Sequence, residues 1–367
     1  MIITHRAIFS GMPIVPIFGH ENTRRRLRRM VESSTLPSSL LFEGARGIGK
    51  QRLALWLAQL LVCERDEKPC NSCLACRSVL ELRHPDVFWV YPRPRLGDSG
   101  ATTDDVIEDL AESSSERAER HGLYPRPSGS EAIYLVSTLA IVAKAAMSPA
   151  IGRRKVFIVG DAERMVAQEG SDQAANAFLM LLEEPPADTT IVLTSSEPGA
   201  LLPTIRSRVV SVRVASLADT DVLAFVREPD VKLALDLLAL PRGDADRVSQ
   251  ARGAPGDLLS VAAISTARAA AARILEAAAS RGAERYETAL AQGASGARGA
   301  FSDMLAELNV LLRERAESLL AVGDQEAAYS AARAAEAVTL AQTRADGNVN
   351  PQLTSAALLA AIQEVWA

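Results

Sequence analysis

The chain has 367 residues, more than one hydrophobic core usually serves, so two or three domains are expected. Its net charge of −5 excludes a protein that binds nucleic acid through an overall basic surface. No apolar run reaches the length that spans a bilayer, and the N-terminus lacks the features of a secretory signal. We therefore expect a cytoplasmic globular protein whose DNA contacts are local or made by its partners.

The first predicted elements are a helix, a strand, a glycine-rich loop and a second helix. Residues 20–35 are typical of an exposed helix, and the short apolar run 38–43 is typical of a buried strand. The loop GARGIGK follows, and then a helical pattern whose leucines at 53, 57, 60 and 61 share one face. This order indicates the opening of a doubly wound α/β domain.

Further strand patterns alternate with helical segments. They occupy residues 87–91, 155–159, 190–194 and 208–214. This alternation predicts a mostly parallel sheet that is covered on both faces. Residues 93–130 interrupt it with Gly, Ser, Pro and acidic residues, and we interpret them as a mobile surface insertion that includes a polar helix over 104–120.

The strand signals stop after Ala215, and the rest of the chain has a helical pattern. The sequence at 216–219 resembles a capping box that starts a small helical domain running to residue 262. Residues 263–367 form a longer block rich in Ala and Leu, broken near 293–299 and 346–351. The expected organisation is an α/β domain over 1–215, a helical lid over 216–262 and a helical domain over 263–367.

The glycine loop matches the GxxxxGK phosphate-binding pattern. Gly44, Gly47 and Gly49 would let backbone N–H groups turn towards an anion, and Lys50 would reach the outer phosphates. The pattern expects Ser or Thr next, because that hydroxyl binds Mg²⁺, but the chain has Gln51. One of the two magnesium positions is therefore lost.

The second magnesium position is also degenerate. An active site of this kind has an Asp-Glu pair directly after an apolar strand, and here the strand pattern 156–159 is followed by Gly160, Asp161 and Ala162. Either register of the pair lacks one required carboxylate. We predict that the chain does not hydrolyse ATP, and whether it still binds ATP or ADP stays open.

The only cysteines of the chain lie within residues 63–76. Cys63, Cys70, Cys73 and Cys76 offer four soft ligands on a short connector, which suits tetrahedral Zn²⁺. The alternative is a set of buried structural cysteines or a redox pair. With four protein ligands no position is open to water, so the predicted zinc is structural.

Two charged motifs have simple structural interpretations. The basic run Arg24–Arg29 could contact DNA phosphates, but such a run is more often a solvated helix face. The motif Leu182–Pro186 (LEEPP) ends in two prolines, which terminate a helix, so we interpret it as architecture.

The order of these motifs resembles the bacterial clamp-loader AAA+ family of the DNA polymerase III holoenzyme, from about residue 13 to 262. Within it, the eroded magnesium positions resemble the delta-prime branch, and Gly253–Gly256 stands where ATPase members place a sensor arginine. The motifs are the glycine loop, the four-cysteine insertion, His84-Pro85-Asp86, strand 155–159, Ala175-Asn176-Ala177-Phe178-Leu179, Leu182-Glu183-Glu184-Pro185-Pro186 and Thr204-Ile205-Arg206-Ser207-Arg208.

The resemblance implies a RecA-like AAA+ domain, a helical lid and a C-terminal collar domain that holds a hetero-oligomer. It implies that Arg208 acts as a trans arginine finger on a neighbouring gamma or tau ATPase, with Arg206 as the competing candidate. The family's SRC motif is here Ser207-Arg208-Val209, without its cysteine. The implied partners are gamma/tau and delta subunits, with the sliding clamp and primed DNA bound through the complex.

Two alternatives remain open at this stage. The first is an active gamma/tau-like clamp-loader ATPase, which predicts magnesium-dependent turnover by the isolated protein. The second is a stand-alone zinc-containing DNA-binding protein, which predicts salt-sensitive DNA binding without partners.

Overall fold

The computed structural model describes residues 13–96, 100–127, 131–165, 172–238, 240, 243–280, 284–292, 300–346 and 349–366. The chain folds as two compact units, each described here by itself. The first contains Met1–Arg126 and Ala132–Leu259, and the second contains Pro127–Glu131 and Ser260–Ala367.

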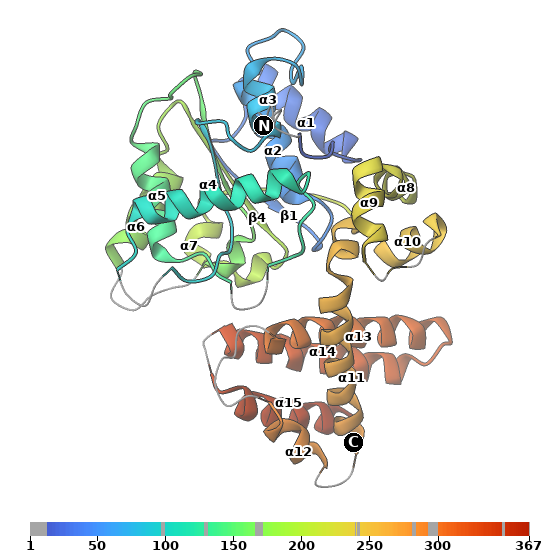
Figure 1. The fold of residues 1–367 in the computed structure, drawn as a ribbon. Coiled ribbons are helices and arrows are strands. Elements are labelled where there is room, and N and C mark those ends of the chain that lie inside the picture. The colour runs from blue at the N-terminus through green and yellow to red at the C-terminus, as the bar shows by residue number, and fades with distance from the viewer. Residues whose placement is uncertain are drawn as a thin grey trace, which may run out of the picture. The chain divides into compact units, whose positions relative to one another are not determined.

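The first unit is built on a five-stranded parallel sheet with the order β2-β3-β4-β1-β5 (Figure 1). The central strands are almost entirely buried, which explains why they are continuous apolar runs in the sequence. All five predicted strands are present. Their bounds are β1 Ser39–Glu43, β2 Val87–Val90, β3 Lys155–Val159, β4 Thr189–Ser195 and β5 Val210–Arg213.

Helices cover the sheet. Helix α2, which directly follows β1, is almost entirely buried. Its Leu53 and Leu57 are 0% exposed, as the leucine spacing predicts. The helices of the first unit are α1 Glu21–Glu32, α2 Lys50–Val62, α3 Leu74–Leu80, α4 Thr103–Glu119, α5 Leu135–Ala145, α6 Asp172–Glu183, α7 Pro203–Arg206, α8 Asp219–Arg227, α9 Pro229–Asp236 and α10 Asp244–Ala251, with short 3-10 turns at Ala162–Arg164, Pro198–Ala200 and Pro255–Ser260.

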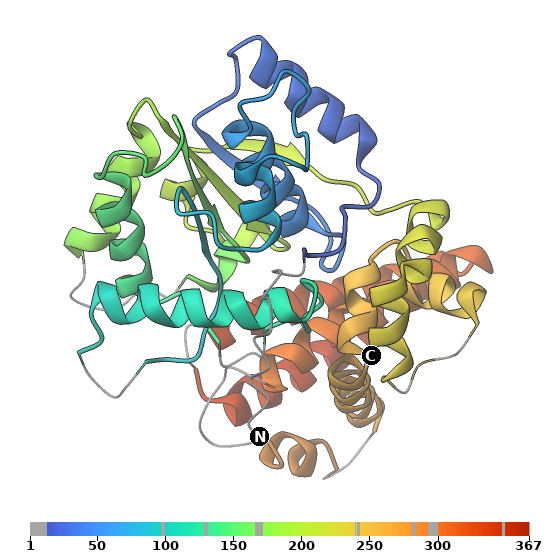
Figure 2. The same cartoon turned by 45° about the horizontal axis from the view of Figure 1, so that its top comes forward.

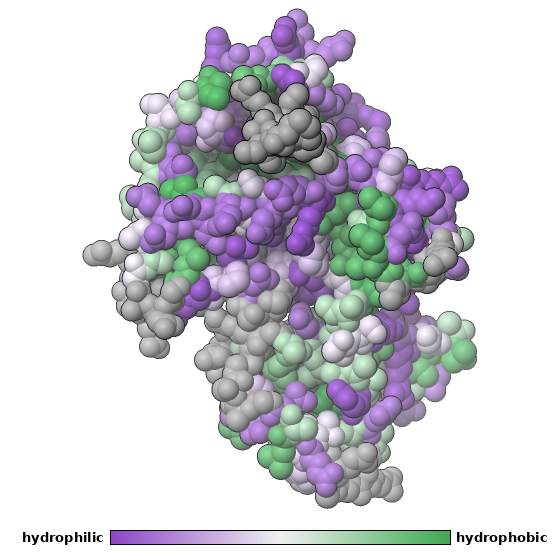
Figure 3. All heavy atoms as spheres, viewed as in Figure 1, coloured by the Kyte–Doolittle hydropathy of each residue, from purple (hydrophilic) through white to green (hydrophobic). Residues whose placement is uncertain are grey.

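The stretch 93–130 contains the polar helix that the sequence suggested, because α4 lies within it. Thr102 caps α4 reciprocally with Asp105. Val106 and Leu110 are buried, while Figure 3 shows a hydrophilic band where α4 faces solvent. Figure 2 shows α4 as a long straight helix. Its buried apolar side anchors this helix to the rest of the unit.

Polar contacts tie α4 to the end of β2. The Arg93 guanidinium donates to both carboxylate oxygens of Asp109, at 2.8 and 2.7 Å. The Tyr91 hydroxyl donates to Ser113 Oγ at 2.9 Å. Residues 97–99 and 128–130 of this stretch lie outside the described residues.

The predicted capping box at 216–219 is wrong. Helix α8 begins at Asp219, after Ala218, and no side chain caps it. The segment 216–218 is instead extended, and Leu217 N–H donates to the Gly253 carbonyl at 2.9 Å. A tertiary contact thus determines where this helix begins.

The second unit is all helical, as predicted for 263–367. The core packs Ala271 and Ile274 of α11 against Leu305 of α13, Val338 of α14 and Leu359 of α15. Small alanines let these helices approach closely. The helices are α11 Val261–Ala279, α12 Glu284–Leu290, α13 Ala300–Ala321, α14 Gln325–Asp346 and α15 Pro351–Trp366. The predicted break at 293–299 lies outside the described residues.

Within the described residues, one helical stretch is long and apolar enough to cross a bilayer by length and composition. This stretch is Pro255–Ala279. The expectation that no apolar run reaches that length is therefore wrong for this segment. Its Ala271 and Ile274 are nevertheless buried in the helical core, and Arg268 forms an ion pair with Glu314 of α13.

Candidate nucleotide pocket and metal centre

The glycine loop has the geometry of a phosphate-binding loop. Helix α2 begins at Lys50, and Gly47 and Gly49 have positive φ values of 75° and 92°. Gly44 faces a different constraint, because a Cβ there would lie 2.2 Å from the Val214 carbonyl oxygen. The glycines that the sequence singled out are thus required by the backbone itself.

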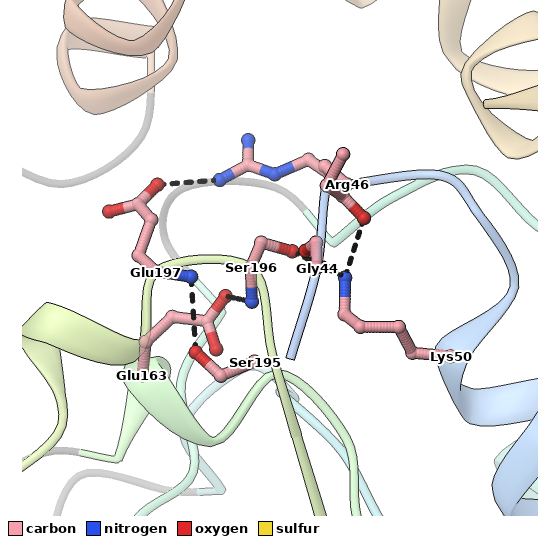
Figure 4. A network of polar contacts seen from close by, with 8 residues as sticks. Gly44, Arg46, Lys50, Glu163, Ser195, Ser196 and Glu197 are labelled. Atoms are coloured by element: carbon pink, nitrogen blue, oxygen red, sulfur yellow. Dashed lines mark hydrogen bonds and ion pairs between the residues drawn. The ribbon is translucent and has the colours of Figure 1, made fainter. Parts of the chain in front are cut away.

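The Lys50 ammonium is bound by the protein's own groups. Its Nζ donates to the carbonyls of Gly44 and Ala45, at 2.9 and 2.8 Å, and to Ser196 Oγ at 2.9 Å (Figure 4). Burial lowers the pKa of Lys50. All three N–H donors are therefore used, and a bound phosphate would have to replace these hydrogen bonds.

Gln51 fills the space next to the degenerate acidic pair. Its Nε2 donates to Asp161 Oδ2 at 3.1 Å, and its Oε1 accepts a hydrogen bond from Trp89 Nε1 at 3.1 Å. A Cβ at Gly160 would lie only 2.4 Å from Gln51 Oε1. The two departures from the magnesium-binding pattern are thus one packing unit, in which the glutamine needs the glycine.

This complementarity predicts non-additive effects of restoring the motif. Gly160→Asp alone should destabilise the fold by about 2–4 kcal/mol, because the new carboxylate meets both Gln51 and Asp161. Adding Gln51→Ser should recover about 1–3 kcal/mol of that loss. Denaturant unfolding of the single and double variants measures the coupling.

Gly199→Asp is the matched control, because a Cβ there meets nothing within 4 Å. We expect it to leave the free energy of unfolding nearly unchanged. Strictly additive effects of the Gln51 and Gly160 substitutions would contradict the packing argument.

Carboxylates that the sequence analysis did not single out also lie around the loop, and Glu163 and Glu197 are two of them. The Glu163 carboxylate accepts a hydrogen bond from Ser196 N–H at 3.0 Å, and burial, followed by the nearby Asp161, raises the pKa of Glu163. Figure 4 shows Glu163 beside Ser196, and on the same network Arg46 pairs with Glu197 at 3.2 Å. The protein's own groups thus already pair with one another around the loop.

Asp257 lies directly against the loop. A Cβ at Gly47 would be 2.6 Å from Asp257 Oδ1, and Gly256 N–H donates to the Gly47 carbonyl at 2.9 Å. Burial raises the pKa of Asp257. This contact joins the glycine loop to the segment that follows α10.

The four cysteines come together as the spacing predicts. Their Sγ atoms all lie within 4.8 Å of one another, with Cys63–Cys73 at 3.9 Å and Cys70–Cys76 at 4.0 Å. A tetrahedral ion with sulfur ligands at about 2.3 Å has sulfur–sulfur edges of about 3.8 Å. The four residues therefore fit a metal centre.

Two helices and two backbone N–H groups orient these sulfurs. Cys63 follows the last residue of α2, and Cys73 caps the start of α3. The Cys73 N–H donates to Cys70 Sγ at 3.3 Å, and the Cys76 N–H donates to Cys73 Sγ at 3.4 Å. The Cys73 N–H, together with Ser72, lowers the pKa of Cys70 to about 5. Such donors favour the thiolate, which is the form that binds metal.

The His84-Pro85-Asp86 motif has a local structural role. Asp86 accepts backbone hydrogen bonds from Ala150, Ile151 and Gly152, at 2.5, 3.0 and 3.0 Å. His84 Nδ1 accepts from the Asp86 N–H at 3.1 Å. This carboxylate therefore fixes the turn that leads into β3.

Arg208 lies in the turn after α7 and is held by Glu183 of the LEEPP motif (Leu182–Pro186). It forms an ion pair with Glu183, the last residue of α6, and its Nη1 donates to the Thr204 carbonyl at 2.8 Å. Its side chain keeps 27% of its surface exposed. The sequence analysis interpreted Glu183 only as part of a helix end, so its contact with Arg208 was missed.

Arg206, the competing candidate, lies in a different local structure from Arg208. Arg206 is the last residue of α7 and is exposed, whereas Arg208 follows in a turn. The two guanidiniums are therefore in different environments, and separate substitutions can distinguish them.

The family model described as "DNA polymerase III, delta subunit" matches residues 19–218, more than half of the chain. The chain belongs to this family. Among relatives, it is 31% identical to the DNA polymerase III subunit delta' of Bacillus subtilis over 184 residues, which are 50% of this chain and 43% of the relative. The Pseudomonas aeruginosa subunit delta' is 34% identical over 173 residues, 46% of this chain and 40% of the relative.

The chain thus spans less than half the length of these curated relatives. The DNA polymerase III subunit tau of Salmonella typhimurium is also similar, at 26% identity over 203 residues, 55% of this chain and 25% of the relative. A solved DNA polymerase III gamma subunit-related protein from Thermotoga maritima is 18% identical, with a TM-score of 0.36 over 93% of this chain and 98% of the other. The family model and these relatives thus place the chain among proteins similar to DNA polymerase III subunits.

Proposed function

We propose that the chain is a delta-prime-like clamp-loader subunit that does not hydrolyse ATP and acts on the ATP site of a neighbouring subunit. The observation that carries this proposal is the position of Gln51. Its amide bridges Trp89 and Asp161 in the space where a motor subunit needs its magnesium ligands.

Hydrolysis needs a magnesium ion, an activated water and a lysine that is free to contact phosphate. Gln51 has no hydroxyl, Gly160 has no carboxylate, and Lys50 donates all its N–H groups to the protein. Each of these features argues against an active gamma/tau-like motor. The chain therefore contributes to catalysis only through a neighbour.

Arg208 is the group proposed to make that contribution. A guanidinium can neutralise the negative charge that grows on a γ-phosphate during transfer. Arg208 is partly exposed, and its ion pair with Glu183 holds it in one orientation before any neighbour binds. Such preorganisation lowers the entropic cost of placing the arginine at a subunit boundary.

The proposed partners are gamma/tau and delta subunits, which join this chain through the C-terminal collar. The sliding clamp and primed DNA are bound through the complex, in the cytoplasm. The five helices of the second unit bury an alanine- and leucine-rich core, which suits a rigid assembly platform.

The cysteine cluster is proposed to bind Zn²⁺ as a structural ion. Four thiolates complete its tetrahedral shell, so no position is open for water or substrate. The ion would fix the connector between α2 and α3. The zinc module is thus part of the scaffold and not a separate DNA-binding protein.

Co-assembly tests this function directly. Tagged chain expressed with gamma/tau and delta subunits from the same cell should co-purify with both, and the complex should load a clamp onto primed DNA. A complex that assembles and loads clamps equally well without this chain would contradict the proposal.

A further inference from the structure

A cavity of about 510 Å³ lies beside α2, away from the phosphate-binding loop. It is lined by the N-terminal segment 13–17, by α1 and by residues of the cysteine connector and α3. Its walls combine apolar side chains with the guanidiniums of Arg24, Arg28 and Arg52. None of the functions proposed above uses this cavity.

Arg52 is the unusual group of the cavity. Its Nε is fully buried and has no hydrogen-bond partner, and the described residues provide no carboxylate that pairs with it. Burial lowers the pKa of Arg52 to about 10, so it remains charged at neutral pH. Arg52 is therefore a half-buried guanidinium in the cavity wall, with a fully buried Nε that has no partner among the described residues.

Arg24 also lines the cavity, but unlike Arg52 it has a carboxylate partner. Its Nη1 lies 3.6 Å from Glu21 and its guanidinium stacks 5.1 Å from the centre of the Trp56 ring, yet its buried Nε has no partner. Arg28 stands one helical turn further along the same face of α1 and is exposed. Three cations and one exposed carboxylate leave the cavity strongly positive.

Burying a guanidinium without an acceptor costs free energy, and native proteins rarely leave such groups unpaired. The first 12 residues contain no Asp or Glu and thus cannot supply a carboxylate. An anionic ligand is the simplest group that would satisfy both Arg24 and Arg52. Guanidinium groups favour phosphate oxygens, which accept two N–H bonds at once.

The rest of the cavity indicates what the phosphate is attached to. Ile14, Ile17 and Leu55 provide apolar walls, and Gln59 and Asn71 add amide groups. The volume is within the range of small-molecule sites. A phosphate joined to a flat, partly apolar base with hydrogen-bonding edges matches this lining.

We propose that this cavity binds the phosphate and base of a nucleotide, either at the end of a DNA strand or as a free nucleotide. The proposal that the nucleotide belongs to a DNA strand rests on the proposed clamp-loader function. The proposal that the cavity binds a phosphate group does not rest on it. The site is separate from the glycine loop and adds a direct nucleotide contact to a chain that is acidic overall.

Isothermal titration of the isolated full chain tests the site with four probes. They are inorganic phosphate, deoxythymidine monophosphate, and a short oligodeoxythymidylate with and without a 5′-phosphate. We expect the 5′-phosphorylated strand to bind most tightly, with an affinity that falls as salt rises. Equal binding of the mononucleotide and the phosphorylated strand would assign the site to free nucleotide.

Arg52→Met should weaken binding about tenfold or more, because a charge-assisted hydrogen bond is lost. It should not lower the melting temperature, since it removes an unpaired buried charge. Arg28→Met provides a second, exposed substitution that should weaken binding at least threefold. Arg26→Met is the control, because it removes the same charge from α1 at an exposed position outside the cavity.

Several results would overturn the assignment. They are no binding of any probe tighter than about 1 mM, equal weakening by Arg26→Met and Arg52→Met, or a lower melting temperature of Arg52→Met with binding intact. The ATPase rate of the assembled complex does not depend on this cavity, so none of these results tests the proposed function. Failure of this inference is therefore distinguishable from failure of the proposed function.

Discussion

Replacing Arg208 by alanine is expected to lower the ATPase rate at the site that it adjoins by about tenfold or more in the reconstituted complex. The substitution removes the positive charge that would offset the growing charge on the γ-phosphate. Stability should change little, because the side chain is partly exposed and its pair with Glu183 lies at the surface. Steady-state ATPase assays with primed DNA and clamp provide the measurement.

Two matched variants sharpen this test. Arg206→Ala removes an exposed guanidinium two positions earlier and should leave the rate within twofold of the unmodified complex. Glu183→Gln releases Arg208 from its ion pair without removing it, so the rate should fall much less than with Arg208→Ala. A reduced rate in Arg206→Ala together with an unchanged rate in Arg208→Ala would transfer the role to Arg206.

Removing the metal should have the largest effect on stability. Denaturing fresh, reduced protein should release about one equivalent of Zn²⁺, and chelation or Cys76→Ser should lower the melting temperature by several degrees or more. The physical reason is that four thiolates held within 4.8 Å of one another are stable together only when a cation neutralises them.

Leu74→Ser is the control for the metal centre. Leu74 lies between two of the cysteines but is 61% exposed, so its loss should change neither the metal content nor the melting temperature appreciably. Release of less than about half an equivalent of zinc from unmodified protein would argue against a four-thiolate site.

The sequence predicted the sheet and the clustering of the four cysteines because their signals are local. The central strands are apolar runs in a parallel sheet, and the four cysteines lie on one connector. The glycine loop was equally clear, since Gly47 and Gly49 occur where the backbone has positive φ. Spacing along the chain was sufficient in each case.

What the sequence did not predict depends on residues that are distant along the chain. Trp89 holds the amide of Gln51 across 38 positions, and Asp257 reaches Gly47 from the end of the lid. No local pattern marks either contact. The loss of magnesium ligands was visible in the sequence, but the way in which Gln51 and Gly160 fit together was not.

The predictions of a helix boundary and of a side-chain pairing were incomplete for the same reason, because both depend on contacts between residues distant along the chain. The predicted capping box at 216–219 does not form, because Leu217 N–H bonds to Gly253 instead. Glu183 was interpreted as the end of a helix, but it also orients Arg208. In both cases a tertiary contact overrides a pattern that is correct only for an isolated segment.

ATP turnover by the isolated chain tests the central claim most directly. The account predicts that purified protein, with magnesium and ATP but no second subunit, releases phosphate no faster than a matched buffer control. The reason is that Gln51 bonds to Asp161 beside the loop, and Lys50 donates to Gly44, Ala45 and Ser196. Turnover at the rate of a motor subunit under these conditions would contradict the account.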